Sequence, residues 1–139
     1  MTELCITGRC YCGKSTINAH APPQVVTYCH CADCRRASGA PVAAFAGFST
    51  GDVNFAPALR ASATAAPDAE RWFCPDCGSP LASTYAYLPG QVYVPLGLLD
   101  QADTLEPQGH AHTDAALPWL HIQDNLPKTA QSARESLKR

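Results

Sequence analysis

The chain has 139 residues, the size of one ordinary domain, and its 46% hydrophobic and 16% charged content is typical of a folded globular protein and not of a disordered one. Ten lysines and arginines against twelve acidic residues give a net charge of -2. This balance leaves no basic surplus to neutralise phosphates, so we expect no nucleic-acid partner.

No segment of the sequence predicts export or membrane insertion. The first residues lack the basic start and long apolar run of a signal peptide, and the longest mainly apolar run, residues 40–48, is interrupted by Pro41 and Gly47. We therefore expect a cytoplasmic protein with no membrane partner. In a reducing compartment, the eight cysteines indicate metal or redox chemistry and not disulfides.

Short β-branched or alternating runs, separated by twelve prolines and nine glycines, predict strands. In chain order the predicted strands are Leu4–Thr7, Ser15–Ala19, Gln24–Cys29, Val42–Phe48, Arg71–Phe73, Leu81–Tyr87 and Gln91–Leu96. One short helix is predicted at Ala32–Ser38, ended by Gly39, and a second after Thr113. The segment Ala56–Ala69 is expected to be an exposed loop or an edge strand. The fold class is therefore mainly β, with antiparallel sheets and one or two short helices.

The sequence shows no internal repeat and no shift in composition that would divide it. Gln131–Lys138 could form a helix but has little apolar face, so we expect a loose C-terminal tail over residues 128–139 and one domain over residues 1–127. The sequence makes no prediction of the oligomeric state.

Two cysteine pairs predict a structural zinc site. Cys74 and Cys77 stand in a C-P-D-C-G turn, where Gly78 favours a tight turn that aims both sulfurs at one ion. Cys10 and Cys12 form a C-x-C pair, which an extended strand places on one face. Together they supply the four sulfurs of a closed tetrahedral zinc site that links the start of the chain to its middle.

Three further cysteines predict a second zinc site of another kind. Cys29 and Cys31 leave a predicted strand, and Cys34 lies one turn into the predicted helix, so the three can surround one ion. Three protein ligands with one open position are typical of a catalytic zinc. The expected metal content is thus two Zn²⁺ per chain.

The fourth ligand of the second site has several candidates. They are Cys5, His20, His110, His112 and His121. If one of them completes the site, the second zinc is closed and has no chemistry. Cys5 is more typical of a small core residue, and His30 is expected to point away from the cysteines beside it and to hydrogen-bond on the opposite face.

The arrangement of all three cysteine clusters resembles a known family. The matching motifs are G-x-C-x-C-G at Gly8–Gly13, C-H-C-x-x-C-R-R-x-x-G at Cys29–Gly39, F-C-x-x-C-G-x-x-L at Phe73–Leu81, and a C-terminal segment with Trp119, Ile122, Asp124 and Leu126-Pro127. In these motifs the chain is similar to the glutathione-dependent formaldehyde-activating enzymes, or S-(hydroxymethyl)glutathione synthases, and their relative centromere protein V. The resemblance covers the chain from about Gly8 to Pro127.

The resemblance implies a β-tent fold with two zinc sites. It implies a structural zinc held by Cys10, Cys12, Cys74 and Cys77, and a catalytic zinc held by Cys29, Cys31 and Cys34. It further implies a carbon–sulfur lyase-type enzyme that acts on glutathione, or another small thiol, and an aldehyde such as formaldehyde, with the thiol sulfur in the fourth position of the catalytic zinc.

Three residues are candidates for substrate contacts. Arg35 and Arg36 either bind glutathione carboxylates or form a solvated helix face, and Trp119 either walls the pocket or belongs to the core. The alternative function is a non-catalytic zinc-binding interaction module of the same fold.

Overall fold

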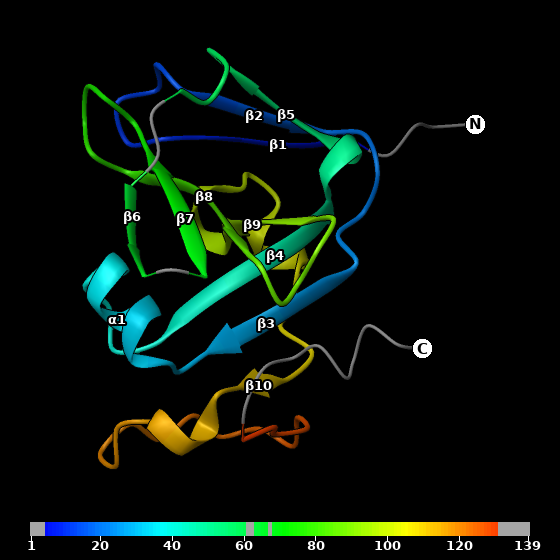
Figure 1. Cartoon of the computed structure of the whole chain (residues 1–139). Helices are drawn as coiled ribbons and strands as arrows, with labels where there is room; N and C mark the ends of the chain where they lie inside the picture. The colour runs from blue at the N-terminus through cyan, green and yellow to red at the C-terminus, as the bar shows by residue number, and fades with distance from the viewer. Residues whose placement is uncertain (1–4, 61–62, 67, 131–139) are drawn as a thin grey trace.

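The structure is a computed structural model and describes residues 5–60, 63–66 and 68–130. Figure 1 shows two β-sheets, with helix α1 (Ala32–Ser38) beside the larger one. Within the described ranges, no helix is long and apolar enough to cross a membrane.

The smaller sheet has three antiparallel strands in the order β1-β2-β5. They are β1 (Ile6–Arg9), β2 (Thr16–Ala19) and β5 (Val53–Ala56). Burial alternates along β1 and β2, as it does when one face of a sheet packs on a core and the other faces water. Figure 1 shows the turn between β1 and β2 at one end of this sheet, at the upper left of the view.

The larger sheet has seven strands in the order β10-β3-β4-β9-β8-β7-β6. They are β3 (Val25–Cys29), β4 (Ala43–Ser49), β6 (Ala63–Ala66), β7 (Ala69–Phe73), β8 (Pro80–Tyr85), β9 (Gln91–Pro95) and β10 (His110–Ala111). All neighbours are antiparallel except β10, which pairs with β3 in parallel. The mainly β prediction is confirmed, and this parallel pair is a departure from all-antiparallel sheets.

The main core lies between the two sheets. Ile17 from β2 and Phe48 and Val94 from β4 and β9 are the largest fully buried side chains, and they belong to one hydrophobic cluster. Burying side chains of this size contributes roughly 1.5–3 kcal/mol each. The sheets are thus held together by apolar contacts, and the cysteine groups lie beside this core.

The helix prediction is confirmed for the first segment and wrong for the second. Helix α1 (Ala32–Ser38) ends at Gly39, whose φ of 75° is the left-handed conformation of a helix C-cap. After Thr113 the chain makes only a 3-10 turn, Thr113–Ala115. The reason is Pro118, because a proline pushes the residue before it away from helical geometry.

The segment between β5 and β7 contains the edge strand β6, as the sequence predicted. Part of that segment, residues 61–62 and 67, lies outside the described residues. The predicted C-terminal tail does too, except for residues 128–130. Within these, the Thr129 amide donates to the His110 carbonyl at 2.9 Å, so the chain just before residue 131 runs along β10.

Candidate metal centres

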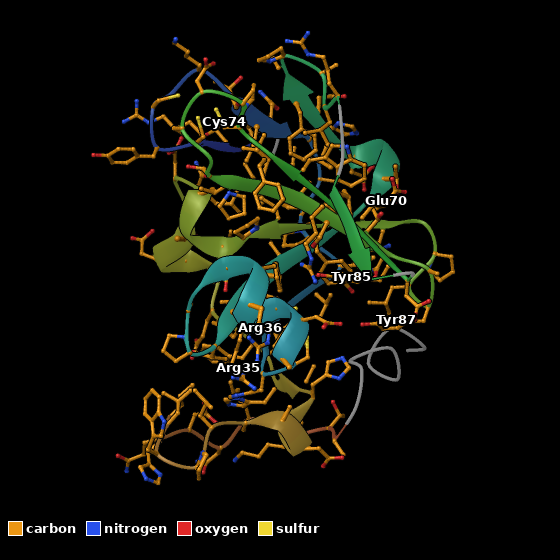
Figure 2. All side chains as sticks on the ribbon, turned by 60° about the vertical axis from the view of Figure 1, so that its left-hand side comes forward. Arg35, Arg36, Glu70, Cys74, Tyr85 and Tyr87 are labelled. Carbon is orange, nitrogen blue, oxygen red and sulfur yellow. The ribbon has the colours of Figure 1, made fainter. Side chains whose placement is uncertain are left out.

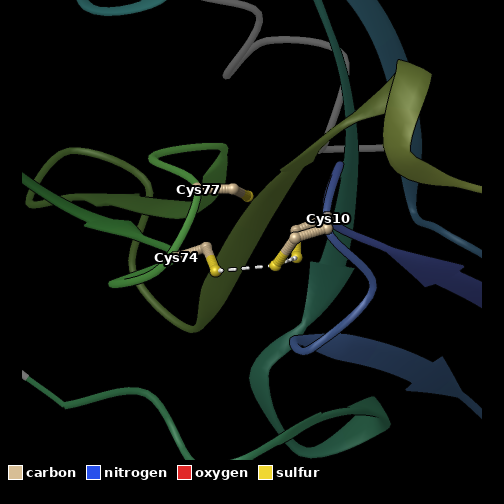
Figure 3. Close-up of side chains that lie close together, drawn as sticks. Cys10, Cys74 and Cys77 are labelled. Carbon is tan, nitrogen blue, oxygen red and sulfur yellow. Dashed lines mark hydrogen bonds between the residues drawn. The ribbon is translucent and has the colours of Figure 1, made fainter.

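Four cysteine sulfurs converge where the two sheets meet. Cys10 directly follows β1 and Cys12 lies in the turn to β2, while Cys74 and Cys77 lie in the turn between β7 and β8. Cys10 and Cys12 sulfurs are 3.5 Å apart, and Cys12 and Cys74 sulfurs are 3.8 Å apart. Figure 3 shows Cys10 approaching from the side opposite Cys74 and Cys77. All four sulfurs lie within 4.8 Å of one another.

Polar neighbours favour the ionised form of two of these thiols, Cys10 and Cys77. The Ser15 amide donates to the Cys10 sulfur at 3.4 Å, and the Ser79 hydroxyl lies 3.2 Å from the Cys77 sulfur. The hydrogen bond with the Ser79 hydroxyl, aided by the Ser79 amide, lowers the pKa of the Cys77 thiol to about 5. The turn itself requires Gly78, whose φ is 80°.

The geometry of this group, named here the four-cysteine group, fits a tetrahedral metal ion. Sulfurs bonded to zinc at about 2.3 Å in a tetrahedron lie about 3.8 Å apart, close to the distances observed. A disulfide would bring two sulfurs to about 2 Å, and all eight cysteines of the chain are free. The four-cysteine group could therefore hold one thiophilic metal ion, because four thiolates suit zinc or iron.

A second group, the three-cysteine group, forms where β3 passes into α1. Cys29 is the last residue of β3, Cys31 is the N-cap of α1, and Cys34 lies in its first turn. The sulfurs of Cys29 and Cys34 are 3.4 Å apart, and the Cys34 amide donates to the Cys31 sulfur at 3.2 Å. Hydrogen bonds from the thiols of Cys29 and Cys34 lower the pKa of Cys31 to about 2, and the same interactions raise the pKa of Cys29. One thiolate is thus stabilised even without a metal.

The three-cysteine group supplies three sulfurs within 4.8 Å of one another. Among the described residues, no histidine or carboxylate completes it. His112 lines the same small cavity as Cys29 and Cys34 but is not part of the group. A tetrahedral ion held there by the described chain would have three protein ligands, in contrast to the four-cysteine group.

A polar network from β7 and β8 reaches Cys34 through Tyr85. The Tyr85 hydroxyl lies 3.8 Å from the Cys34 sulfur and 2.9 Å from the Ser83 hydroxyl, and it accepts a hydrogen bond from Arg71 Nη1 at 3.3 Å. Burial raises the pKa of Tyr85 above its ordinary value, so its hydroxyl remains protonated. Sequence reasoning did not single out these three residues. Alternation along β8 would have placed Ser83 and Tyr85 on one face, but only the sheet register sets Arg71 opposite Ser83.

Cavities reach the three-cysteine group on two sides. One, of about 230 Å³, lies between α1 and the larger sheet and is lined by Cys34, Arg71 and Ser83 together with apolar side chains. The other, of about 30 Å³, has Cys29, Cys34, Tyr85 and Tyr87 in its wall. Burial raises the pKa of Tyr87 to about 12, so it too keeps its proton. The group is therefore accessible from pockets that small molecules can enter.

His30 points away from the cysteines beside it, as the sequence predicted. Its Nε2 lies 2.9 Å from His110 Nδ1, and His110 Nε2 lies 2.9 Å from the Asp124 carboxylate. Because a carboxylate only accepts, His110 donates to Asp124 through Nε2 and, when neutral, accepts from His30 through Nδ1. This network ties the loop that carries Cys29 and Cys31 to the C-terminal segment.

The remaining candidate residues lie apart from these cavities. Arg35 is half-buried and Arg36 exposed on α1, and neither lines the cavity beside Cys34. Figure 2 shows both arginines at the helix and Cys74 towards the opposite end of the molecule, which separates the two cysteine groups. Trp119 is 63% exposed, so it is not a core residue. Their roles in substrate binding stay predictions.

Cys5 is exposed, and the prediction of a core position for it is wrong. It precedes β1, and its thiol lies 3.8 Å from the Asn18 side-chain oxygen on β2, at a solvent-facing position of that strand. A lone cysteine next to apolar residues does not reveal on which face of the sheet it lies. Neither cysteine group includes it.

Comparisons with known proteins give a family and a fold. The sequence model of a family described as glutathione-dependent formaldehyde-activating enzyme matches residues 5–115. A crystal structure of a Rhodobacter sphaeroides protein, solved as a structural-genomics target, is 20% identical over 88% of this chain and 99% of that protein, with a TM-score of 0.52. At that identity the likeness shows the fold alone. No curated protein matches the chain significantly.

Proposed function

Because the chain belongs to the glutathione-dependent formaldehyde-activating enzyme family, we propose that it is a zinc-dependent enzyme of the carbon–sulfur lyase type that joins glutathione, or a similar small thiol, to an aldehyde such as formaldehyde. The observation that carries the proposal is the contrast between the two cysteine groups. One offers four sulfurs, while the other offers three and adjoins cavities. The four-cysteine group would hold a structural zinc, and the three-cysteine group a catalytic one.

The reaction is an addition in which atoms and electrons balance. The thiol sulfur forms a bond to the aldehyde carbon, the carbonyl π-bond breaks, and the oxygen takes up the proton that the thiol released. A zinc ion at the three-cysteine group would supply a Lewis acid that keeps a bound thiol in its thiolate form. Thiolate is the reactive species, and a free thiol of pKa about 8.5 is only a few per cent ionised at neutral pH.

The protein's own residues position the reactants. The Cys31 sulfur is fixed by the Cys34 amide, and α1 is fixed at its other end by Gly39. Tyr85 and Tyr87, whose hydroxyls keep their protons, line the small cavity beside Cys29 and Cys34, and each can donate a hydrogen bond to the oxygen of a small aldehyde. Full ionisation of the thiol contributes at most about thirtyfold in rate, so the remaining acceleration comes from holding thiol and aldehyde together.

The test is the rate of S-(hydroxymethyl)glutathione formation from glutathione and formaldehyde, followed by NMR exchange spectroscopy. We expect metal-loaded wild-type protein to accelerate the reaction above the uncatalysed rate. In Cys31→Ser the catalysed rate should be lower by at least about tenfold, because the substrate thiol loses its binding position. We expect the metal content to fall from two ions per chain to one.

Cys5→Ser is the matched control, since Cys5 is exposed and lies outside both cysteine groups. It should keep both the metal content and the rate of the wild-type protein. Full activity in Cys31→Ser would contradict the catalytic assignment. If millimolar glutathione gives no heat in a titration of the metal-loaded protein, the chain is better described as a zinc-binding interaction module.

A further inference from the structure

Arg71 places a positive charge in a largely apolar part of the molecule. It is half-buried on β7, and its guanidinium carbon lies 5.5 Å from the centre of the Tyr85 ring. Of its five N–H groups, one donates to the Tyr85 hydroxyl. Among the described residues, the cation–carboxylate pairs within 4.0 Å involve Lys14, His20 and His110, and none involves the Arg71 guanidinium. Arg71 therefore has donors available for an anion.

The guanidinium borders the larger cavity of the three-cysteine group. Apart from Arg71, Cys34, Ser38 and Ser83, the wall consists of apolar side chains and glycine, contributed by α1, β4 and the chain between them, by β7 and β8, and by the end of β9 and the segment after it. A carboxylate is bound most strongly by arginine where water is excluded, because two parallel N–H···O bonds form in a medium of low polarity. The volume of about 230 Å³ lies below the ~300–1,000 Å³ of ordinary ligand pockets. The cavity thus suits a small molecule with an apolar body and one anionic end.

Cys34 lines the same cavity, so one ligand can reach both Arg71 and the three-cysteine group. We propose that this cavity binds small thiols that carry a carboxylate, with the carboxylate on Arg71 and the sulfur towards Cys34. This inference rests on the proposed function, because it names the class of thiol that the three-cysteine group receives. It makes Arg71 the residue that selects acidic thiols over neutral ones.

A competing role for Arg71 is to offset the negative charge of the thiolates. In that case Arg71 acts on the cysteine group itself, and its removal changes the binding of acidic and neutral thiols to the same extent. A carboxylate-binding arginine instead changes the binding of acids alone. The two roles are therefore separated by the ratio of two affinities.

The experiment measures by isothermal titration the affinity of metal-loaded protein for 3-mercaptopropionate, for its neutral analogue 3-mercapto-1-propanol, and for butyrate, which has no thiol. We expect the wild-type protein to prefer the acidic thiol by about ten- to hundredfold, the range of a charged hydrogen-bonded pair. Arg71→Met should abolish this preference, and Arg71→Lys should keep part of it. Ala37→Leu, which fills the cavity from α1, should weaken both acids without altering Arg71.

Arg60→Met is the matched control, because Arg60 is exposed and does not line this cavity. It should leave all three affinities unchanged. Equal affinity of the wild-type protein for both thiols, or an equal loss for both in Arg71→Met and Arg71→Lys, overturns the inference while the proposed function stands. If neither thiol binds but butyrate binds in an Arg71-dependent way, the carboxylate site is upheld and the thiol chemistry of the proposed function fails.

Discussion

Hydrogen-bond donors next to two of the sulfurs favour their ionised form before any metal binds. The Ser79 hydroxyl lowers the pKa of Cys77, and the thiols of Cys29 and Cys34, together with the Cys34 amide, lower the pKa of Cys31. A metal ion binds cysteines in their deprotonated form. Each thiol that is already ionised therefore reduces the free energy that is needed to remove protons when the metal binds. Both groups therefore contain a thiolate that neighbouring hydrogen-bond donors stabilise, although one group is built from turns and the other from a strand end and a helix.

Asp124 gives a prediction at the scale of a single residue. The hydrogen bond from His110 lowers the pKa of Asp124 below its ordinary value of about 3.9. A carboxyl group whose pKa is lowered on folding stabilises the protein above the pKa of the unfolded state, and this stability is lost as the pH falls through the folded pKa. Asp124→Asn removes the charge and keeps only one of the two acceptor oxygens, which accept from His110 and from the Leu126 amide, so we expect a lower free energy of unfolding at neutral pH.

The difference between wild type and Asp124→Asn should be constant from pH 8 to about 5 and should shrink below about pH 4. Urea unfolding at each pH measures it. Both proteins contain the same cysteines, so acid release of metal affects them alike. A difference that grows towards low pH would contradict this reading of the His110–Asp124 pair.

Single residues differ in how far the sequence predicts them. The seven grouped cysteines were predicted because their spacing is local: each pair or triplet spans a turn or a strand end. The exposure of Cys5 and Trp119 was not predicted, because it depends on which elements cover them. Arg71 was missed for a related reason, since its place opposite Ser83, in the network that reaches Cys34, comes from the register of β7 against β8.

At the scale of elements, helix α1 and its N-cap supply two sulfurs of the three-cysteine group, those of Cys34 and Cys31, and the helix is only seven residues long. A helix this short depends on its caps, because an isolated helix of that length is unstable in water. Its bounds followed from local signals, namely the cysteines at its start and Gly39 at its end. The parallel pairing of β10 with β3 had no local signal, since its partners are far apart in the sequence.

Gly39→Ala tests how far the three-cysteine group depends on this helix. Gly39 has a φ of 75°, a conformation that costs a residue with a Cβ about 1–2 kcal/mol. We expect the free energy of unfolding to fall by about 1 kcal/mol, and the metal affinity of the three-cysteine group to fall more than that of the four-cysteine group. Urea unfolding and competition with a chelator measure the two effects.

The matched control is Gly51→Ala. A Cβ added at Gly51 meets no atom within 4 Å, and its φ is not positive. That variant should unfold within about 0.5 kcal/mol of the wild-type protein. If Gly39→Ala were equally harmless, the cap would not be what holds α1 and Cys34 in place.

At the scale of the whole molecule, the two cysteine groups close loops of very different length. The four-cysteine group joins the β1–β2 turn of the smaller sheet to the β7–β8 turn of the larger sheet, with Cys12 and Cys74 62 residues apart. In the three-cysteine group, Cys29 and Cys34 are 5 residues apart. From the dependence of loop entropy on length, closing the longer loop constrains the unfolded chain by about 2 kcal/mol more. A metal in the four-cysteine group would therefore act on the whole fold.

This difference predicts opposite consequences for two equivalent substitutions. Cys74→Ser removes a sulfur from the link between the sheets. We therefore expect it to lower the free energy of unfolding by at least about 2 kcal/mol more than Cys31→Ser does. The loss can be much larger, because the binding energy of a structural zinc is roughly 10 kcal/mol. Because a domain is stable by only about 5–15 kcal/mol, Cys74→Ser protein should be partly unfolded, whereas Cys31→Ser protein stays folded and loses activity. Circular dichroism and urea unfolding of the metal-loaded variants measure this, with Cys5→Ser as the unchanged control. Equal stability of Cys74→Ser and Cys31→Ser would mean that apolar packing alone joins the two sheets, and the division into a structural and a catalytic centre would lose its basis.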